Sequence, residues 1–80
     1  MSSHEIAFDG LRQGDRATVL RFGAMPDHYR NQLLSLGLTP GTEFRVERLA
    51  PLGDPVEISV RGFRLSLRRA EAASMRVKLL

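Results

Sequence analysis

The side chains best suited to bind a metal ion in this chain are its two histidines, His4 and His28. Protein metal sites combine imidazole ligands with further His, Cys or carboxylate ligands at short, regular spacings. His28 follows Asp27 directly, but adjacent residues do not share a helix face, and no second histidine lies three or four positions away. We interpret both histidines as solvent-facing. They are weak candidates for an adventitious metal that could bridge two molecules in a weak homodimer.

Side chains that serve as nucleophiles in enzymes lack their usual partners here. Ser35, Ser59, Ser66 and Ser74 have no histidine close in sequence, and no glycine-flanked serine forms a nucleophile elbow. No glycine-rich run precedes a lysine, as a phosphate-binding loop requires. The chain also has no cysteine, so thiolate chemistry is absent. These patterns predict a protein that is not an enzyme and has no cofactor.

The pair Gly53-Asp54 is the remaining place where a carboxylate could act as an acid or base. Pro51 and Pro55 flank the pair, which is typical of a rigid loop. Aspartate in such a loop commonly accepts a hydrogen bond from its own backbone two residues further on. We therefore expect a structural turn in which Asp54 bonds its own backbone.

Length and charge limit the kinds of partner that the chain could have. Its 80 residues are expected to form a single domain, residues 1–80. The net charge is +3, but nine acidic residues are interleaved with twelve basic ones, so charge selects no partner. Neither a signal peptide nor the ~20 apolar residues needed to cross a bilayer can be found. We expect a cytoplasmic protein without direct membrane insertion.

One amphipathic helix is predicted at about residues 26–36. Pro26 suits the first helical position, where its missing N–H would be unpaired in any case. Gly37 suits the left-handed position after a helix, and Leu38 would then contact Leu33. At 100° per residue one narrow apolar stripe faces the core. The stripe consists of Met25, Tyr29, Leu33 and Leu36.

The rest of the chain alternates between apolar and polar residues, as strands do. Pro40-Gly41 fits the centre of a type II turn, and Arg61-Gly62 connects two strands as a hairpin. In this alternation Phe44 and Phe63 point inwards, and a shift of phase within residues 17–22 predicts either a bulge or a switch of the buried face. The predicted strands cover residues 17–22, 43–47, 56–60, 63–68 and 75–79, with Ile6 and Phe8 as an edge strand before them.

Together these elements predict a mainly β fold. About five short strands with tight turns suit a small, strongly bent barrel, into which the helix at 26–36 is inserted. The alanine-rich residues 69–73 add a short helical turn.

Three residues of the predicted helix are candidates for contact with a partner. Leu34 lies about 180° around the helix from Met25, so the core stripe does not account for it. Either the helix is wedged between two surfaces, or Leu34 is an exposed apolar contact. Tyr29 can pack its ring while its hydroxyl stays in water. Arg30 lies on the same arc as Leu34, so these three residues are partner-facing candidates, and Arg61 at the hairpin turn is a fourth.

A basic strip offers an alternative function, because small barrels often bind RNA through arginines and stacked aromatic rings. The strip would run along the outward side of neighbouring strands. However, both strand phenylalanines are expected to face inwards, which argues against RNA and leaves an acidic protein partner or solubility as explanations. The basic residues are Arg45, Arg61, Arg64 and Arg68.

The order and spacing of the turn residues resemble the FeoA family, ferrous iron transport protein A, from Leu11 to Leu79. The residues that carry the resemblance begin at Tyr29-Arg30 and continue through the leucine-rich helix end into the two loops that follow it. A single piece of this pattern, such as Pro-Gly, is common in proteins, but the whole set of pieces in this order and at these spacings is specific to the family. The structural motif comprises Gly37, Pro40, Gly41, Pro51, Gly53, Asp54 and Pro55.

This resemblance implies an SH3-like barrel with an inserted helix, in a small cytoplasmic protein that works with the membrane transporter FeoB. The partner would be the cytoplasmic region of that transporter, which includes a GTP-hydrolysing domain. The role would be accessory or regulatory, and membership alone does not imply that this chain binds iron.

Two mechanisms follow from that implied partner. An adaptor would stabilise one conformation of the transporter, which requires only a preferential contact with that state. An arginine finger, supplied by Arg61 or Arg30, would accelerate GTP hydrolysis. We favour the adaptor. The barrel also resembles the carboxyl-terminal domain of iron-dependent transcriptional repressors, but 80 residues leave no room for their separate DNA-reading domain.

Overall fold

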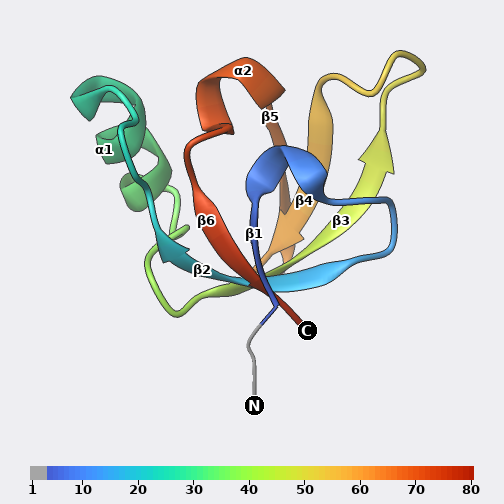
Figure 1. Ribbon diagram of the computed structural model, residues 1–80, viewed down its shortest axis with the longest axis horizontal. Helices are drawn as coiled ribbons and strands as arrows, with labels where there is room; N and C mark the ends of the chain where they lie inside the picture. The colour runs from blue at the N-terminus through green and yellow to red at the C-terminus, as the bar shows by residue number, and fades with distance from the viewer. Residues whose placement is uncertain (1–3) are drawn as a thin grey trace.

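The computed structural model describes residues 4–80, which form one antiparallel sheet that curls around a single core and carries two helices (Figure 1). The strand order is β1-β6-β2-β3-β4-β5, so β1 and β5 form the two edges. The elements are β1 (Glu5–Ala7), the 3₁₀ turn η1 (Phe8–Gly10), β2 (Arg16–Arg21), α1 (Asp27–Ser35), β3 (Glu43–Leu49), β4 (Val56–Val60), β5 (Phe63–Leu67), α2 (Arg69–Ala72) and β6 (Arg76–Leu79).

This architecture confirms the predicted small, mainly β barrel. The inserted helix and the short helical turn are α1 and α2. There are six strands because the edge strand indicated near Ile6 forms, although Phe8 belongs to η1 and is buried in the core. No helix within residues 4–80 has the length and apolar composition needed to cross a membrane.

A bulge in β2 lets both ends of this strand contribute to the core. Val19 pairs with Val77 and Arg21 with Arg76, so Leu20 is an extra residue on β2. Val19 and Phe22 are therefore both buried although they are three positions apart. The predicted bulge is confirmed. A second bulge in β3, between Val46 and Arg48, was not indicated by the sequence.

Two successive turns connect α1 to β3 as the sequence predicts. Gly37 has φ +94°, and its N–H donates to the Leu34 carbonyl at 3.0 Å. The Leu38 N–H donates to the Leu33 carbonyl at 3.0 Å, which completes a Schellman ending. Then Gly41, at φ +90°, occupies the left-handed position of the type II turn. These turns set the direction of α1 relative to the sheet.

The start of α1 is held by a close backbone approach. Gly23 has φ +67°, and a Cβ added there would lie 2.5 Å from the carbonyl oxygen of Ser74. The Ser74 hydroxyl in turn donates to the Phe22 carbonyl at 2.7 Å. The segment that leads into α1 is thus fastened to the residues between α2 and β6.

The loop between β3 and β4 is fastened to α2, but not in the predicted manner. We expected Asp54 to bond its own backbone; instead its Oδ1 accepts a hydrogen bond from the Arg69 backbone N–H at 2.9 Å. The Arg69 guanidinium donates to the carbonyls of Gly53 and Asp9. The expectation was wrong because a free N–H at the start of α2 lies within reach of the loop, and such groups attract a carboxylate.

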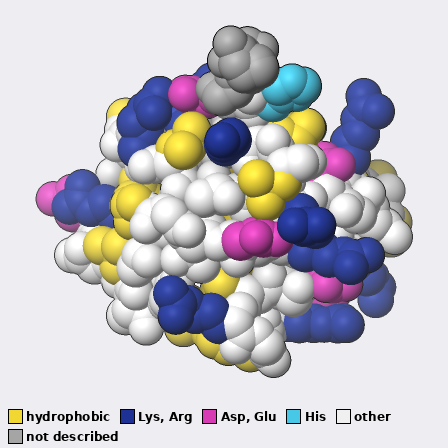
Figure 2. Space-filling model, turned by 90° about the horizontal axis from the view of Figure 1, so that it is seen from below, with side chains coloured by type: hydrophobic (Ala, Val, Ile, Leu, Met, Phe, Trp, Pro, Cys, Tyr) yellow, Lys and Arg dark blue, Asp and Glu magenta, His cyan; other side chains and the backbone are white. Residues whose placement is uncertain are grey.

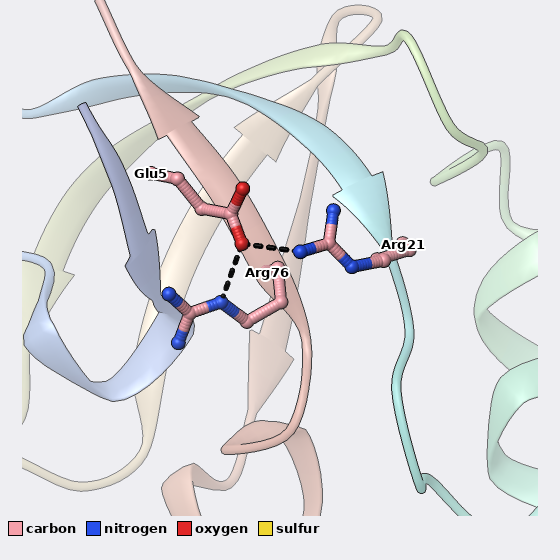
Figure 3. A network of polar contacts seen from close by, with 3 residues as sticks. All are labelled: Glu5, Arg21 and Arg76. Atoms are coloured by element: carbon pink, nitrogen blue, oxygen red, sulfur yellow. Dashed lines mark hydrogen bonds and ion pairs between the residues drawn. The ribbon is translucent and has the colours of Figure 1, made fainter. Parts of the chain in front are cut away.

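An ion network at the β1 side of the sheet holds β1 against its neighbours (Figure 3). The Glu5 carboxylate accepts hydrogen bonds from Arg76 Nε at 2.9 Å and from Arg21. These arginines come from β6 and β2, so one side chain connects three strands. The hydrogen bond from Arg76 is the main reason why the pKa of Glu5 lies below its ordinary value, and the charges of both arginines lower it further.

Glu5→Gln is therefore expected to lower the melting temperature at neutral pH. Because the pKa of Glu5 is lower in the folded state, its contribution is present above the unfolded value of about 4.3 and disappears as the pH falls through the folded value. The melting temperatures of the two proteins should become equal as the pH is lowered from neutral to acidic. Glu43→Gln, in the exposed pair with Arg16, is the control and should change little; equal losses for both variants would contradict the account.

Gly23→Ala is expected to destabilise the protein more than Gly14→Ala. Both glycines have positive φ, so alanine costs about 1–2 kcal/mol at either position. A Cβ at Gly14 meets nothing within 4 Å, whereas at Gly23 it would meet the Ser74 carbonyl. Urea unfolding of the two variants measures the difference. Equal free energies of unfolding would show that the close approach at Gly23 is not a constraint.

Candidate functional site

A cavity of about 280 Å³ lies between α1, β5 and α2. Figure 1 shows α1 at one side of the curled sheet, joined to it through the segments at its two ends. We call the cavity the α1–β5 groove. Its lining residues are His28, Tyr29, Gln32, Leu33, Leu36, Leu65, Ser66, Leu67, Arg68 and Glu71.

The groove has an apolar floor and a polar rim. The four lining residues of α1 and Leu36, which directly follows the helix, lie three and four positions apart along the chain, so they share one helix face. Leu33 and Leu67 are buried, whereas Leu36 and Leu65 are half-buried. His28, Gln32, Arg68 and Glu71 are exposed around them. Half-buried leucines beside exposed polar groups are typical of a surface that another molecule could cover.

Tyr29 is half-buried in the wall of this groove. Burial raises the pKa of its phenol above the ordinary value, and the negative charge of Glu71 raises it further. Tyr29 therefore stays protonated at neutral pH and presents a neutral hydroxyl group to the groove.

Arginines flank β5 at both of its ends. Arg61 occupies the tight turn before β5 with φ +51°, and its Cδ lies 3.5 Å from the position of a Cβ added to Gly37, against the end of α1. Arg68 lines the groove just after β5. Within residues 4–80 neither arginine has a carboxylate oxygen within 4.0 Å. Both charges are free to pair with an acidic partner.

The predicted partner-facing residues do not all lie at the groove. Tyr29 lines the groove and Arg61 lies beside the helix end. Arg30 instead forms an ion pair with Asp27 at 3.0 Å and does not line the groove. Leu34 is half-buried and packs against the core, in agreement with a helix wedged between surfaces.

Phe63 is a candidate contact residue that the sequence analysis placed wrongly. We expected it to point inwards, but 43% of its surface is exposed. Its cross-strand neighbour Val60 is buried, whereas Phe63 starts the edge strand, where no further strand covers it. Alternation gives the face of a residue but not whether its strand is an edge. The Arg61-Gly62 turn directly before Phe63 was the feature of the sequence that could have indicated its exposure.

The predicted basic strip lies on a surface of mixed charge. Arg45 and Arg64 flank Ser59 across three strands, but Arg64 lies 3.7 Å from Glu57, and the Ser59 hydroxyl donates to Glu47. Figure 2 likewise shows basic side chains beside acidic ones on the face that it presents. A second hollow of about 270 Å³ on the β3–β4 side contains both Arg48 and Glu57.

The described residues form no cluster of three or more His, Cys, Asp or Glu side chains that could hold a metal ion. His4 and His28 are both exposed, one before β1 and the other in the first turn of α1. Gly53 and Asp54 are used by the contact with Arg69, so the loop between Pro51 and Pro55 is structural.

The curled sheet of short antiparallel strands with one inserted helix defines a small SH3-like barrel. Residues 8–79 match the sequence model described as FeoA domain. The chain belongs to the FeoA family, whose proteins take part in ferrous iron transport.

Similar proteins agree with this assignment. The Fe(2+) transport protein A/Fe(2+) transporter FeoB fusion protein of Porphyromonas gingivalis is 34% identical over 70 residues, which are 88% of this chain and 8% of that protein. The FeoA protein from Chlorobium tepidum superposes with a TM-score of 0.85 at 41% identity, covering 94% of this chain and 70% of the other.

A zinc complex of Stenotrophomonas maltophilia FeoA, described as a procaryotic SH3 domain protein, has a TM-score of 0.77 at 27% identity, covering 90% and 88% of the two chains. A manganese-dependent transcriptional repressor superposes with a TM-score of 0.84 at 18% identity, covering 100% of this chain and 44% of the repressor. At this identity the similarity shows only that the two proteins share a fold.

Glu71→Gln is expected to lower the pKa of Tyr29 without restoring the ordinary value of about 10, because burial is the larger cause. Tyr29 is the single tyrosine, so ultraviolet absorbance of the phenolate reports this residue alone. Glu57→Gln, outside the groove, is the control. A titration that Glu71→Gln leaves unchanged would show that the two side chains do not interact.

Proposed function

We propose that this chain is a cytoplasmic accessory protein of ferrous iron uptake, which binds the cytoplasmic, GTPase-containing region of a FeoB-type transporter as an adaptor. The observation that carries the proposal is the P. gingivalis relative, in which an A part is joined to the FeoB transporter in one polypeptide. Fusing two modules makes their encounter intramolecular and raises the effective concentration of one for the other. Such a fusion is expected where the separate proteins associate.

The α1–β5 groove is the surface that we propose for this contact. It combines half-buried leucines, the phenol of Tyr29 and two flanking arginines, whereas the outer face of the sheet has its charges interleaved. An adaptor needs no reactive group; it needs a surface that fits one state of its partner better than another. The groove offers such a surface on an element, α1, that is inserted into the barrel.

The arginine-finger mechanism has one remaining candidate. Arg30 is engaged by Asp27, so it would have to break an ion pair first. Arg61 has no acidic partner among the described residues, but its stem lies against the end of α1. We retain the adaptor, for which Arg61 is a flanking charge of the groove.

RNA binding is less well supported than binding to a protein. Phe63 is an exposed ring beside Arg64, contrary to our expectation, but stacking platforms need several such rings. Phe8, Phe22 and Phe44 are all buried.

Isothermal titration of the protein with the cytoplasmic region of its FeoB-type transporter, with and without GTP, tests the proposal. Gln32→Trp should weaken binding by about tenfold or more, because Gln32 is exposed and lines the groove. Asn31→Trp is the matched control, since Asn31 is an exposed neighbour on α1 that does not line the groove.

Absence of binding in every nucleotide state would contradict the adaptor function. Equal affinities for the two tryptophan variants would reject the groove as the docking surface. Measuring GTP hydrolysis in the same samples distinguishes the mechanisms, because an arginine finger requires a rate increase that Arg61→Ala abolishes.

A further inference from the structure

Strand β5 has an open edge that the fold does not cover. It pairs with β4 alone and ends the sheet. A two-residue turn joins Val60 to Phe63, and the residues that flank such a turn exchange hydrogen bonds with each other. Along an antiparallel pair every second residue directs its backbone N–H and C=O groups to the neighbouring strand. The backbone groups of Phe63, Leu65 and Leu67 therefore bond to β4. The N–H and C=O groups of Arg64 and Ser66 point away from the sheet, and no backbone partner for them occurs within residues 4–80.

This open edge forms one wall of the α1–β5 groove. Leu65, Ser66 and Leu67 line the groove from one side and the helix face of α1 lines it from the other. The five residues of β5 span about 17 Å, and the nine residues of α1 span about 14 Å. The two walls therefore match in length, and four or five residues of an extended chain would fit along them.

Charge identifies the kind of segment that this edge would accept. Arg61 and Arg68 lie at the two ends of β5 without acidic partners among the described residues, whereas Glu71 is the one carboxylate in the lining. A second copy of the chain is disfavoured, because antiparallel pairing of two β5 edges would bring the Arg61 end of one copy beside the Arg68 end of the other, so that like charges would meet. An acidic segment with apolar side chains suits the edge better.

We propose that the β5 edge binds an extended segment of the transporter's cytoplasmic region as an added strand. This inference rests on the proposed function and specifies its mode of contact. The backbone of the segment pairs with Arg64 and Ser66, its apolar side chains enter the groove beside Leu65, and acidic residues near its ends meet Arg61 and Arg68. Strand addition takes its affinity from main-chain hydrogen bonds and its specificity from side-chain pockets.

Ser66→Pro removes one outward N–H and keeps the ladder to β4, because proline is tolerated where an edge strand faces solvent. Ser66→Ala retains that N–H and is the matched control. Titrations with the cytoplasmic region of the transporter should show that Ser66→Pro binds about tenfold more weakly, whereas Ser66→Ala binds like the original protein.

Amide hydrogen exchange supplies a second readout on the unmodified chain. The Arg64 and Ser66 amides should exchange fast in the free protein and at least about tenfold more slowly in the complex. If Ser66→Pro fails to fold, Arg68→Glu replaces it, with Arg45→Glu as the control on the outer face of β3.

The outcomes separate the two proposals. Unaltered exchange at Arg64 and Ser66 in a complex that forms normally, or undiminished binding by Ser66→Pro, would overturn strand addition and leave the adaptor function in place. Absence of any complex would overturn both. Slow exchange at these amides in the protein alone, together with a doubled mass in solution, would assign the edge to a second copy and also overturn the proposal.

Discussion

The extra residue in β2 determines where the helix and the groove lie. A regular strand would alternate its faces, so Val19 and Phe22 could not both enter the core. Because Leu20 is bulged, both are buried, and the chain leaves β2 toward Gly23 and the start of α1. The close approach of Gly23 to Ser74 then fastens one end of the helix, and the Schellman ending at Gly37 fastens the other. Between these two points α1 stands beside β5 rather than completing the sheet.

The edge strands of a small barrel are either protected from further pairing or available to pair with another chain. In this one the edge strand β1 has only three residues and is tied to its neighbours by the ion network of Glu5. The β5 edge has no such protection apart from nearby charges. Its open backbone groups, the half-buried Leu65 and the exposed Phe63 occur on the same strand, next to the groove. Edge and groove together make up the surface that we propose for the partner.

Local signals in the sequence were sufficient for most of the fold. Pro26, Gly37 and Pro40-Gly41 restrict the backbone only at neighbouring residues, so the limits of the helix and the turns after it could be predicted from the sequence. The phase shift in residues 17–22 likewise indicated the irregularity in β2. The errors concern contacts between distant segments. Asp54 finds its partner at Arg69, and Phe63 is exposed because of the strand order, which no local pattern contains. Tyr29, one of the predicted partner-facing residues, lines the groove, but the β5 wall opposite it could not be foreseen for the same reason.

Chemical-shift mapping tests the central claim most directly, namely that the groove between α1 and β5 is the partner surface. Unlabelled cytoplasmic region of the FeoB-type transporter would be added to the isotope-labelled protein. The account predicts that the largest backbone shifts occur at the groove face of α1, around His28 and Gln32, and along Leu65 to Arg68. Shifts concentrated on β1, η1 and β6, or around Arg45 and Arg48 on the outer face, would contradict it.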